Sequence, residues 1–292
     1  MSTSDPKVIA PLVVGIFGSH NGRDFTAPFI VAFIVTMFYY GLNVIYPTMV
    51  NIFYLTPEIS RGYELALSLP GNIGLVFGAM LLICFGDVLR HYWWTLWISW
   101  AGVLFWGGMM AMATPSNKGL IIAFAFLEQT FFGWAQYLSV AFTQLGVHQH
   151  DLGMPGGLAG VARYAGGSLA QAIYVSIMAN AQSARFAATL RGAAISAGAD
   201  DATATALLAA FPLGSAAIAD IPGVNEEILA AVGSAFQWSY AHALKITALS
   251  SLSFGGLGLI CCFLCENIDG KTNQTTNVFL ENDVNADKIE FH

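Results

Sequence analysis

One acidic side chain interrupts a long apolar stretch near the middle of the sequence. Glu128 lies within the run from Gly119 to Ala141, which is long enough to cross a bilayer, since about 20 helical residues suffice. An ionised carboxylate at that depth is costly, so it normally faces a protein interior or a water-filled path. A buried carboxyl group can exchange a proton near neutral pH and so couple proton movement to substrate movement. The alternative is a protonated, hydrogen-bonded structural acid.

Polar side chains recur at helical spacing on two of the apolar runs. Tyr40 and Asn43 share one face of the run from Ala27 to Met49, and Gln136 follows Glu128 by two helical turns. These two faces predict an internal cavity lined by Tyr40, Asn43, Glu128 and Gln136. The alternative for Asn43 is a hydrogen bond to a neighbouring helix, as polar residues in membrane bundles form.

A glycine-rich segment precedes a cation in a third run. Gly153 with Gly157, and Gly156 with Gly160, form overlapping G-x-x-x-G pairs, a pattern that lets helix backbones approach closely. We therefore predict helix packing at these four glycines. Arg163 lies about two turns inside the run, where it could snorkel, pair with an acid or hold an anion. Structural anchoring and a functional role both remain open for Arg163.

One short polar cluster invites a metal interpretation. His148, His150 and Asp151 have side chains that ligate zinc or iron, but no second histidine-rich motif follows them. We interpret the cluster as a polar loop at the membrane surface, and we expect neither a metal nor a cofactor. The four cysteines lack zinc-site spacing. Neither a glycine-rich phosphate loop with its lysine nor a basic cluster is present, so we expect no nucleic-acid partner.

The composition places these residues in a membrane. Apolar residues make up 56% of the 292 residues and charged residues only 10%, against roughly 25% charged in soluble domains. We predict an all-α, polytopic membrane protein with six spans. They run over about 27–49, 65–85, 93–113, 119–141, 156–179 and 243–265.

The sequence divides into three parts. We interpret residues 1–25 as the remnant of a preceding helix plus a loop, 26–266 as the six-span bundle, and 267–292 as an acidic tail. The alanine-rich segment 182–242 carries many charges and is expected to form a helical cap outside the bilayer. Lys and Arg in the short loops favour a cytoplasmic tail and a cap on the opposite side.

Several stretches of the sequence resemble a known family. The segments 27–41 (APFIVAFIVTMFYYG), 157–177 (GLAGVARYAGGSLAQAIYVSI), 221–225 (IPGVN) and 236–245 (FQWSYAHALK) are similar to the fungal trichothecene efflux pump family. This family belongs to the fourteen-span drug:proton antiporters of the major facilitator superfamily. The resemblance extends from about Arg23 to Glu266. It implies the C-terminal bundle of a two-bundle transporter, whose first and fourth helices face a central cavity.

The same resemblance implies a function. The family exports toxic metabolites or drug-like molecules, or handles siderophore-bound iron, driven by protons across the plasma membrane or the vacuolar membrane. The expected partners are a small-molecule substrate, protons and the lipid bilayer. Glu128 departs from the small or apolar residue expected at its position. Because a rocking mechanism needs two halves, we expect a missing N-terminal bundle or a second chain to complete the transporter.

Two other functions remain as alternatives. A metal-dependent membrane enzyme would use His148 and His150, although we expect no enzyme. A non-transporting partner would only pack against other membrane proteins, and its glycine face at Gly153 to Gly160 would then matter more than the cavity face.

Overall fold

The described chain is built from helices. The computed structural model describes residues 26–55, 59–89, 91–145, 153–211, 217–218 and 221–270. These ranges contain no strand and seven α-helices, which confirms the predicted all-α class: α2 (Ala27–Met49), α3 (Arg61–Leu89), α4 (Tyr92–Met109), α5 (Lys118–Leu145), α6 (Gly153–Ser196), α7 (Asp201–Ala210) and α9 (Glu226–Leu264). A π-helix, η2 (Val50–Tyr54), continues α2, and a 3-10 turn, η3 (Met110–Met112), continues α4.

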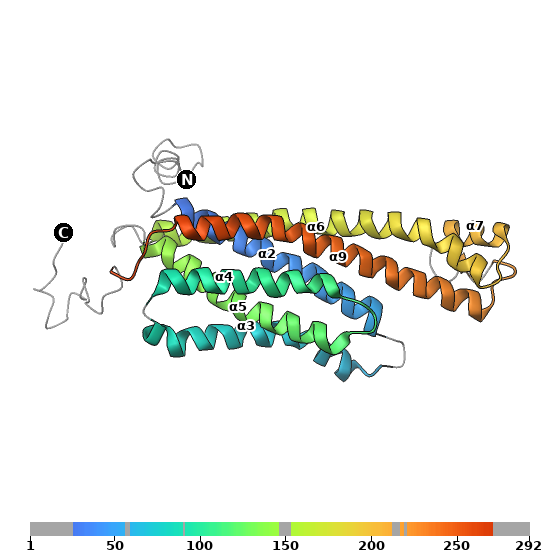
Figure 1. The fold of residues 1–292 in the computed structure, drawn as a ribbon, viewed down its shortest axis with the longest axis horizontal. Coiled ribbons are helices and arrows are strands. Elements are labelled where there is room, and N and C mark those ends of the chain that lie inside the picture. Colours follow the sequence, from blue (N-terminus) through green and yellow to red (C-terminus); the bar gives the residue numbers. More distant parts are fainter. Residues whose placement is uncertain are drawn as a thin grey trace, which may run out of the picture.

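Six of these helices pack together in one bundle. Four are long and apolar enough to cross a membrane by length and composition: α2 with η2, α3, α4 with η3, and α9. Helices α5 and α6 are long enough, at 28 and 44 residues, but carry more polar residues. Both pack inside the same bundle, α5 against α3 and α4, and α6 against α2 and α9 (Figure 1). The chain is therefore a multi-pass membrane protein.

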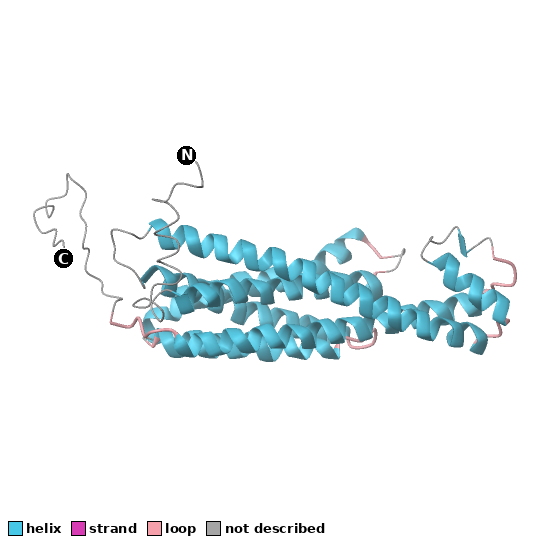
Figure 2. Ribbon diagram, turned by 90° about the horizontal axis from the view of Figure 1, so that it is seen from above, coloured by secondary structure: helices cyan, strands magenta, loops and turns pink. Residues whose placement is uncertain are grey.

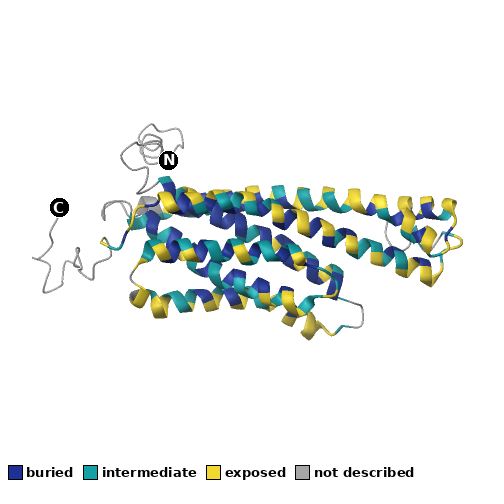
Figure 3. Ribbon diagram, in the orientation of Figure 1, coloured by how far each residue is buried: buried dark blue, intermediate teal, exposed yellow. Residues whose placement is uncertain are grey.

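Helix α2 lies at the centre of the bundle and α3 at its edge. Helix α2 contacts α5, α6 and α9, and its Val31 and Val35 side chains are fully buried. Helix α3 packs mainly against α5 and leaves Ile73, Met80 and Ile83 exposed (Figure 3). An exposed apolar face of this kind suits contact with lipid or with another helical bundle.

Helices α3 and α5 cross closely because both carry glycine at the crossing. A Cβ atom at Gly78 would overlap the backbone of Thr130. From the other side, a Cβ atom at Gly133 would lie 2.8 Å from the carbonyl oxygen of Leu75. Small residues at such contacts let the helix backbones meet, so α3 is held against α5 although little of α3 is buried.

Helices α6 and α9 continue far beyond the other helices. At 1.5 Å per residue, their 44 and 39 residues extend about 66 and 58 Å, twice the roughly 30 Å hydrocarbon thickness of a bilayer. Figures 1 and 2 show both helices running past the ends of the other spans, with α7 beside their far ends. The helical cap expected over 182–242 is thus built largely from continuous extensions of two spanning helices.

The cap has an apolar core of its own. Phe186, Phe211 and Phe236 form a ring cluster with centroid distances of 4.6 to 5.3 Å. Leu190 of α6 and Ile228 of α9 are almost fully buried in the same core. Because α6, α7 and α9 all contribute to this core, the cap is packed rather than a loose loop.

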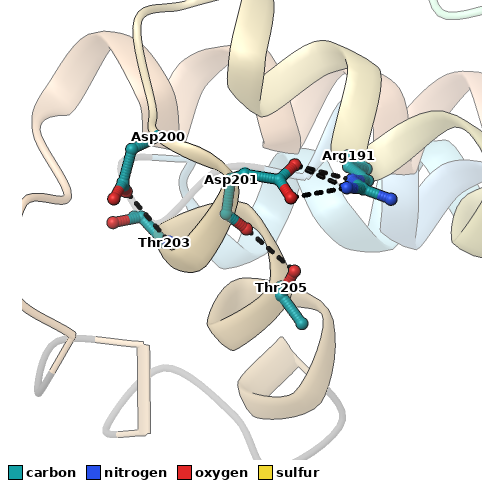
Figure 4. A network of polar contacts seen from close by, with 5 residues as sticks. All are labelled: Arg191, Asp200, Asp201, Thr203 and Thr205. Atoms are coloured by element: carbon teal, nitrogen blue, oxygen red, sulfur yellow. Dashed lines mark hydrogen bonds and ion pairs between the residues drawn. The ribbon is translucent and has the colours of Figure 1, made fainter.

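Polar contacts fix the start of α7 (Figure 4). Asp200 is the N-cap and accepts a hydrogen bond from the Thr203 backbone N–H at 3.0 Å. Hydrogen bonds from Thr203 lower the pKa of Asp200 below its ordinary value. Arg191 donates from Nη2 to both carboxylate oxygens of Asp201 at 2.6 Å, and this contact raises the pKa of Arg191. These contacts join α6 to the beginning of α7.

The other end of the bundle is tied to the segment after α9. The Asp269 carboxylate accepts the Tyr92 backbone N–H at 2.8 Å and lies 3.4 Å from Nδ1 of His91. The Trp93 indole donates to the carbonyl oxygen of Cys265 at 3.0 Å. The first residues after α9 therefore contact the beginning of α4. The predicted N-terminal segment 1–25 and the tail beyond residue 270 lie outside the described residues.

Candidate functional site

A polar cavity lies where four helices of the bundle meet. Its volume is about 210 Å³. Helix α2 supplies three of its lining residues, α6 another three, and α3 and α5 one each: Thr36, Tyr39, Tyr40, Leu75, Gln136, Gly160, Arg163 and Tyr164. Helices α2 and α5 are the first and fourth spans, which the resemblance placed at a central cavity.

Three predicted site residues reach this cavity from three different helices. Tyr40 comes from α2, Gln136 from α5 and Arg163 from α6. The Nε atom of Arg163 is buried and has no hydrogen-bond partner among the described residues. Among the described residues, the lining contains no carboxylate. A guanidinium with unused donors suits an anionic or hydrogen-bond-accepting group, and the phenol and amide groups add neutral donors and acceptors.

Asn43 lies apart from this cavity. Its side chain is exposed and donates from Nδ2 to the carbonyl oxygen of Tyr39, one turn earlier in α2, at 3.1 Å. The cavity lining does not include it. Asn43 therefore lies on the same helix as Tyr40 but outside the cavity that Tyr40 lines.

Glu128 is buried elsewhere in the bundle. Its side chain has no exposed surface, and its Oε2 atom accepts a hydrogen bond from Nε2 of Gln129 at 2.9 Å. A Cβ atom placed at Gly107 would lie 3.6 Å from Cγ of Glu128, so this side chain lies beside α4. The Oε1 atom has no hydrogen-bond partner among the residues that the structure describes. The structure therefore separates Glu128 from the cavity that contains Gln136.

The predicted glycine motif has few close neighbours among the described residues. Within that part of the chain, no atom lies within 4 Å of the Cβ positions of Gly157 and Gly160, and Gln144 alone approaches Gly156. Gly153 is the first residue of α6. Gly160 also lines the cavity.

The close contact between α2 and α6 lies further along α6. A Cβ atom at Gly166 would overlap the backbone of Phe33, and one at Gly167 would overlap the ring of Tyr40. The sequence reasoning missed these two glycines, although the pair Gly166-Gly167 was visible as a further small-residue signal in the same run. It also missed Tyr164, which lines the cavity and is the sequence neighbour of Arg163.

The alternative metal interpretation concerns residues outside the described ranges. His148, His150 and Asp151 lie outside the described residues. Within the described ranges, no three His, Cys, Asp or Glu side chains gather as metal ligands would.

The bundle and its cavity define a class of protein. A multi-pass helical membrane protein with a polar cavity between its spans has the architecture of a membrane transporter. The comparisons with known proteins agree. The sequence matches the fungal trichothecene efflux pump family over residues 6–289, so the chain belongs to this family. The family contains transporters rather than enzymes, and the match confirms the resemblance inferred from the sequence.

One characterised relative adds to the comparison. The MFS-type transporter prx5 of Penicillium rubens is 38% identical to this chain over 299 residues, which cover 94% of the chain and 54% of the relative. The chain thus spans about half the length of the curated relative it matches. No solved structure matches the chain.

Proposed function

We propose that this chain forms the C-terminal bundle of a proton-coupled efflux transporter that exports a toxic or drug-like small molecule. The observation that carries the proposal is the meeting of α2, α3, α5 and α6 around one polar cavity. Membership of an efflux pump family supports transport in general. Small molecules bind in concave sites with a few well-placed polar groups, and this cavity has that composition.

The proposed substrate contacts are Tyr40, Gln136 and Arg163. Arg163 supplies a charged donor whose Nε atom has no partner within the described chain. Tyr40 and Gln136 supply neutral polar groups from the two facing helices. We infer that the substrate presents at least one hydrogen-bond acceptor to Arg163.

The proposed proton carrier is Glu128. It is a fully buried acid in a membrane-spanning helix, and one of its carboxyl oxygens lacks a partner among the described residues. Intramembrane acids are rare because they are costly, and many belong to proton pathways. Since Glu128 lies outside the cavity, coupling to substrate would act through helix movement rather than through direct contact.

Alternating access requires a second bundle. Transporters of this kind work by rocking one bundle against the other around a central site. The exposed apolar side chains of α3 and the open glycine face of α6 offer surfaces for such a bundle. We propose that an N-terminal bundle, in the same protein or in a second chain, completes the transporter in the plasma membrane or the vacuolar membrane.

The test is transport by the chain together with a matching N-terminal bundle. Both are produced in one protein or co-expressed, reconstituted in vesicles, and assayed for pH-gradient-driven uptake of a substrate panel that includes a ferric siderophore. We expect Arg163→Gln and Gln136→Leu to abolish transport with the protein still inserted. Glu128→Gln should abolish the dependence of transport on the pH gradient.

A matched control distinguishes the loss of these roles from general misfolding of the protein. Arg191→Gln removes a cation from the same helix as Arg163, but in the cap, and should leave transport unchanged. Transport that persists in Arg163→Gln would contradict the proposal that this cavity binds the substrate. A gradient dependence that survives Glu128→Gln would remove Glu128 as the proton carrier.

A further inference from the structure

A second and larger cavity lies outside the bundle core, where the cap meets the spans. Its volume is about 750 Å³. It is bounded by α6, by α9 and by the turn between α4 and α5, and it is lined by Ala111, Met112, Ala113, Thr114, Asn117, Arg185, Thr189, Ala235, Trp238, Ser239, Ala241, His242 and Lys245. No function considered so far uses this cavity.

The cavity is basic. Arg185 of α6 and His242 and Lys245 of α9 line it, and all three side chains are exposed. Within the described chain, the lining holds no Asp or Glu, and no hydrogen bond or ion pair occupies these three side chains. By contrast, Arg191, less than two turns further along α6, is held by Asp201. The positive charge at the cavity is therefore left without a protein counter-charge in these ranges.

The donors converge because of their helical spacing. Trp238, His242 and Lys245 follow one another at intervals of four and three residues, which places them on one face of α9. Arg185 and Thr189 are four residues apart on α6, which packs along α9. Both sets line the same cavity.

The cavity lies at the level of a membrane surface. Thr114 and Asn117 belong to the turn at which α4 ends and α5 begins, so this level marks where two spans leave the bilayer. Trp238 is 55% exposed here, and tryptophan is enriched at membrane–water interfaces. Alanine and methionine side chains form much of the remaining lining.

We propose that this cavity binds the phosphate-bearing headgroup of a membrane phospholipid. Arg185 and Lys245 would donate charge-assisted hydrogen bonds to the phosphate oxygens, since guanidinium and ammonium groups are the usual phosphate partners in proteins. His242 and Thr189 would add further donors, and Trp238 would pack against the glycerol and upper acyl region. A free phosphate ion has the same chemistry, but the apolar lining and the position of the cavity beside the turn between α4 and α5 favour the lipid.

The test is native mass spectrometry of the full 292-residue chain released from detergent micelles that contain phosphatidylglycerol. We expect the wild-type chain to retain one lipid tightly. The double variant Arg185→Gln/Lys245→Gln should bind it at least about tenfold more weakly, because two charge-assisted hydrogen bonds are removed. Both substituted side chains are exposed, and circular dichroism checks that the helices remain.

The control is the double variant Arg61→Gln/Arg191→Gln, which removes two exposed arginines that do not line this cavity. It should retain the lipid as the wild-type chain does. Equal retention by the site variant, or equal loss by both variants, would overturn the proposal. A second arm adds a large excess of inorganic phosphate. Displacement of the lipid by phosphate would assign the cavity to a free anion and overturn the lipid assignment, whereas retention supports it.

Discussion

Tyr39 of α2 and Phe132 of α5 are stacked, with ring centroids 4.7 Å apart and ring planes only 17° from parallel. Tyr39 lines the bundle cavity, while Phe132 is almost fully buried. On α5, Phe132 lies one turn from Glu128 and one turn from Gln136. The stacked pair therefore links a residue that lines the proposed substrate cavity to a residue one turn from the proposed proton carrier.

The stacking predicts a measurable coupling energy. We expect a double-mutant cycle of Tyr39→Leu and Phe132→Leu to give a coupling of about 0.5–1.5 kcal/mol, the range measured for aromatic pairs beyond their buried area. The measurement is unfolding of the chain in detergent, followed by circular dichroism. Additive effects of the two substitutions would mean that the rings do not stabilise each other.

The contact between α4 and α9 predicts a glycine requirement. Trp100 is fully buried and donates from Nε1 to the carbonyl oxygen of Gly255 at 2.8 Å, and a Cβ atom at Gly258 would overlap its ring. Gly258→Ala should lower the free energy of unfolding by about 1–3 kcal/mol through overpacking. Gly256→Ala is the matched control, because nothing lies within 4 Å of its Cβ position, and it should be neutral or stabilising. Equal effects at the two positions would contradict the packing described here.

The glycines of α6 predict a similar contrast. Gly166→Ala should destabilise the chain by about 1–3 kcal/mol, because the added methyl group would overlap the backbone of α2. Gly157→Ala, within the predicted G-x-x-x-G motif, meets no atom of the described residues within 4 Å and should not destabilise the isolated chain. Thermal unfolding of both variants is the measurement. A Gly157→Ala variant as unstable as Gly166→Ala would place the tight contact at the motif instead.

Asp200, the N-cap residue of α7, predicts that the stability of this helix start depends on pH. Hydrogen bonds from Thr203 favour the ionised form of Asp200 in the folded chain, so its pKa lies below the ordinary value of 3.8. Because the pKa of Asp200 is lower in the folded chain than in the unfolded chain, its ionised carboxylate stabilises the fold at pH values above the unfolded pKa. This stabilisation is lost as the pH falls through the folded pKa. In a chain labelled with ¹⁵N-threonine, the Thr203 amide resonance should titrate with a midpoint below 3.8.

Asp200→Asn tests that assignment. Asparagine remains a good N-cap but does not titrate, so the Thr203 resonance should no longer respond through this pH range. A wild-type midpoint at or above 3.8, or an unchanged titration in the asparagine variant, would contradict the capping role of the ionised carboxylate.

Helical register explains where the sequence reasoning on the site diverged from the structure. Glu128 and Gln136 are two turns apart, and spacing alone suggested one shared cavity. Eight residues at 100° per residue leave the two side chains about 80° apart around the axis. Because different helices surround α5, the two side chains have different environments: Glu128 lies beside Gly107 of α4, whereas Gln136 lines a cavity with residues of α2 and α6. Asn43 and Tyr40 diverge in the same way on α2.

The sequence by itself determined the class of this protein, because hydrophobic runs of span length with few charges can satisfy their backbone in a bilayer only as helices. It also determined family membership and the candidate polar residues, which stand out against apolar surroundings. Only the tertiary structure decided which of them share a cavity, which glycines meet a neighbouring backbone, and that three basic side chains without a partner in the described ranges gather beside Trp238. Those relationships depend on how distant helices are rotated and packed against one another, and local sequence patterns carry no information about that rotation.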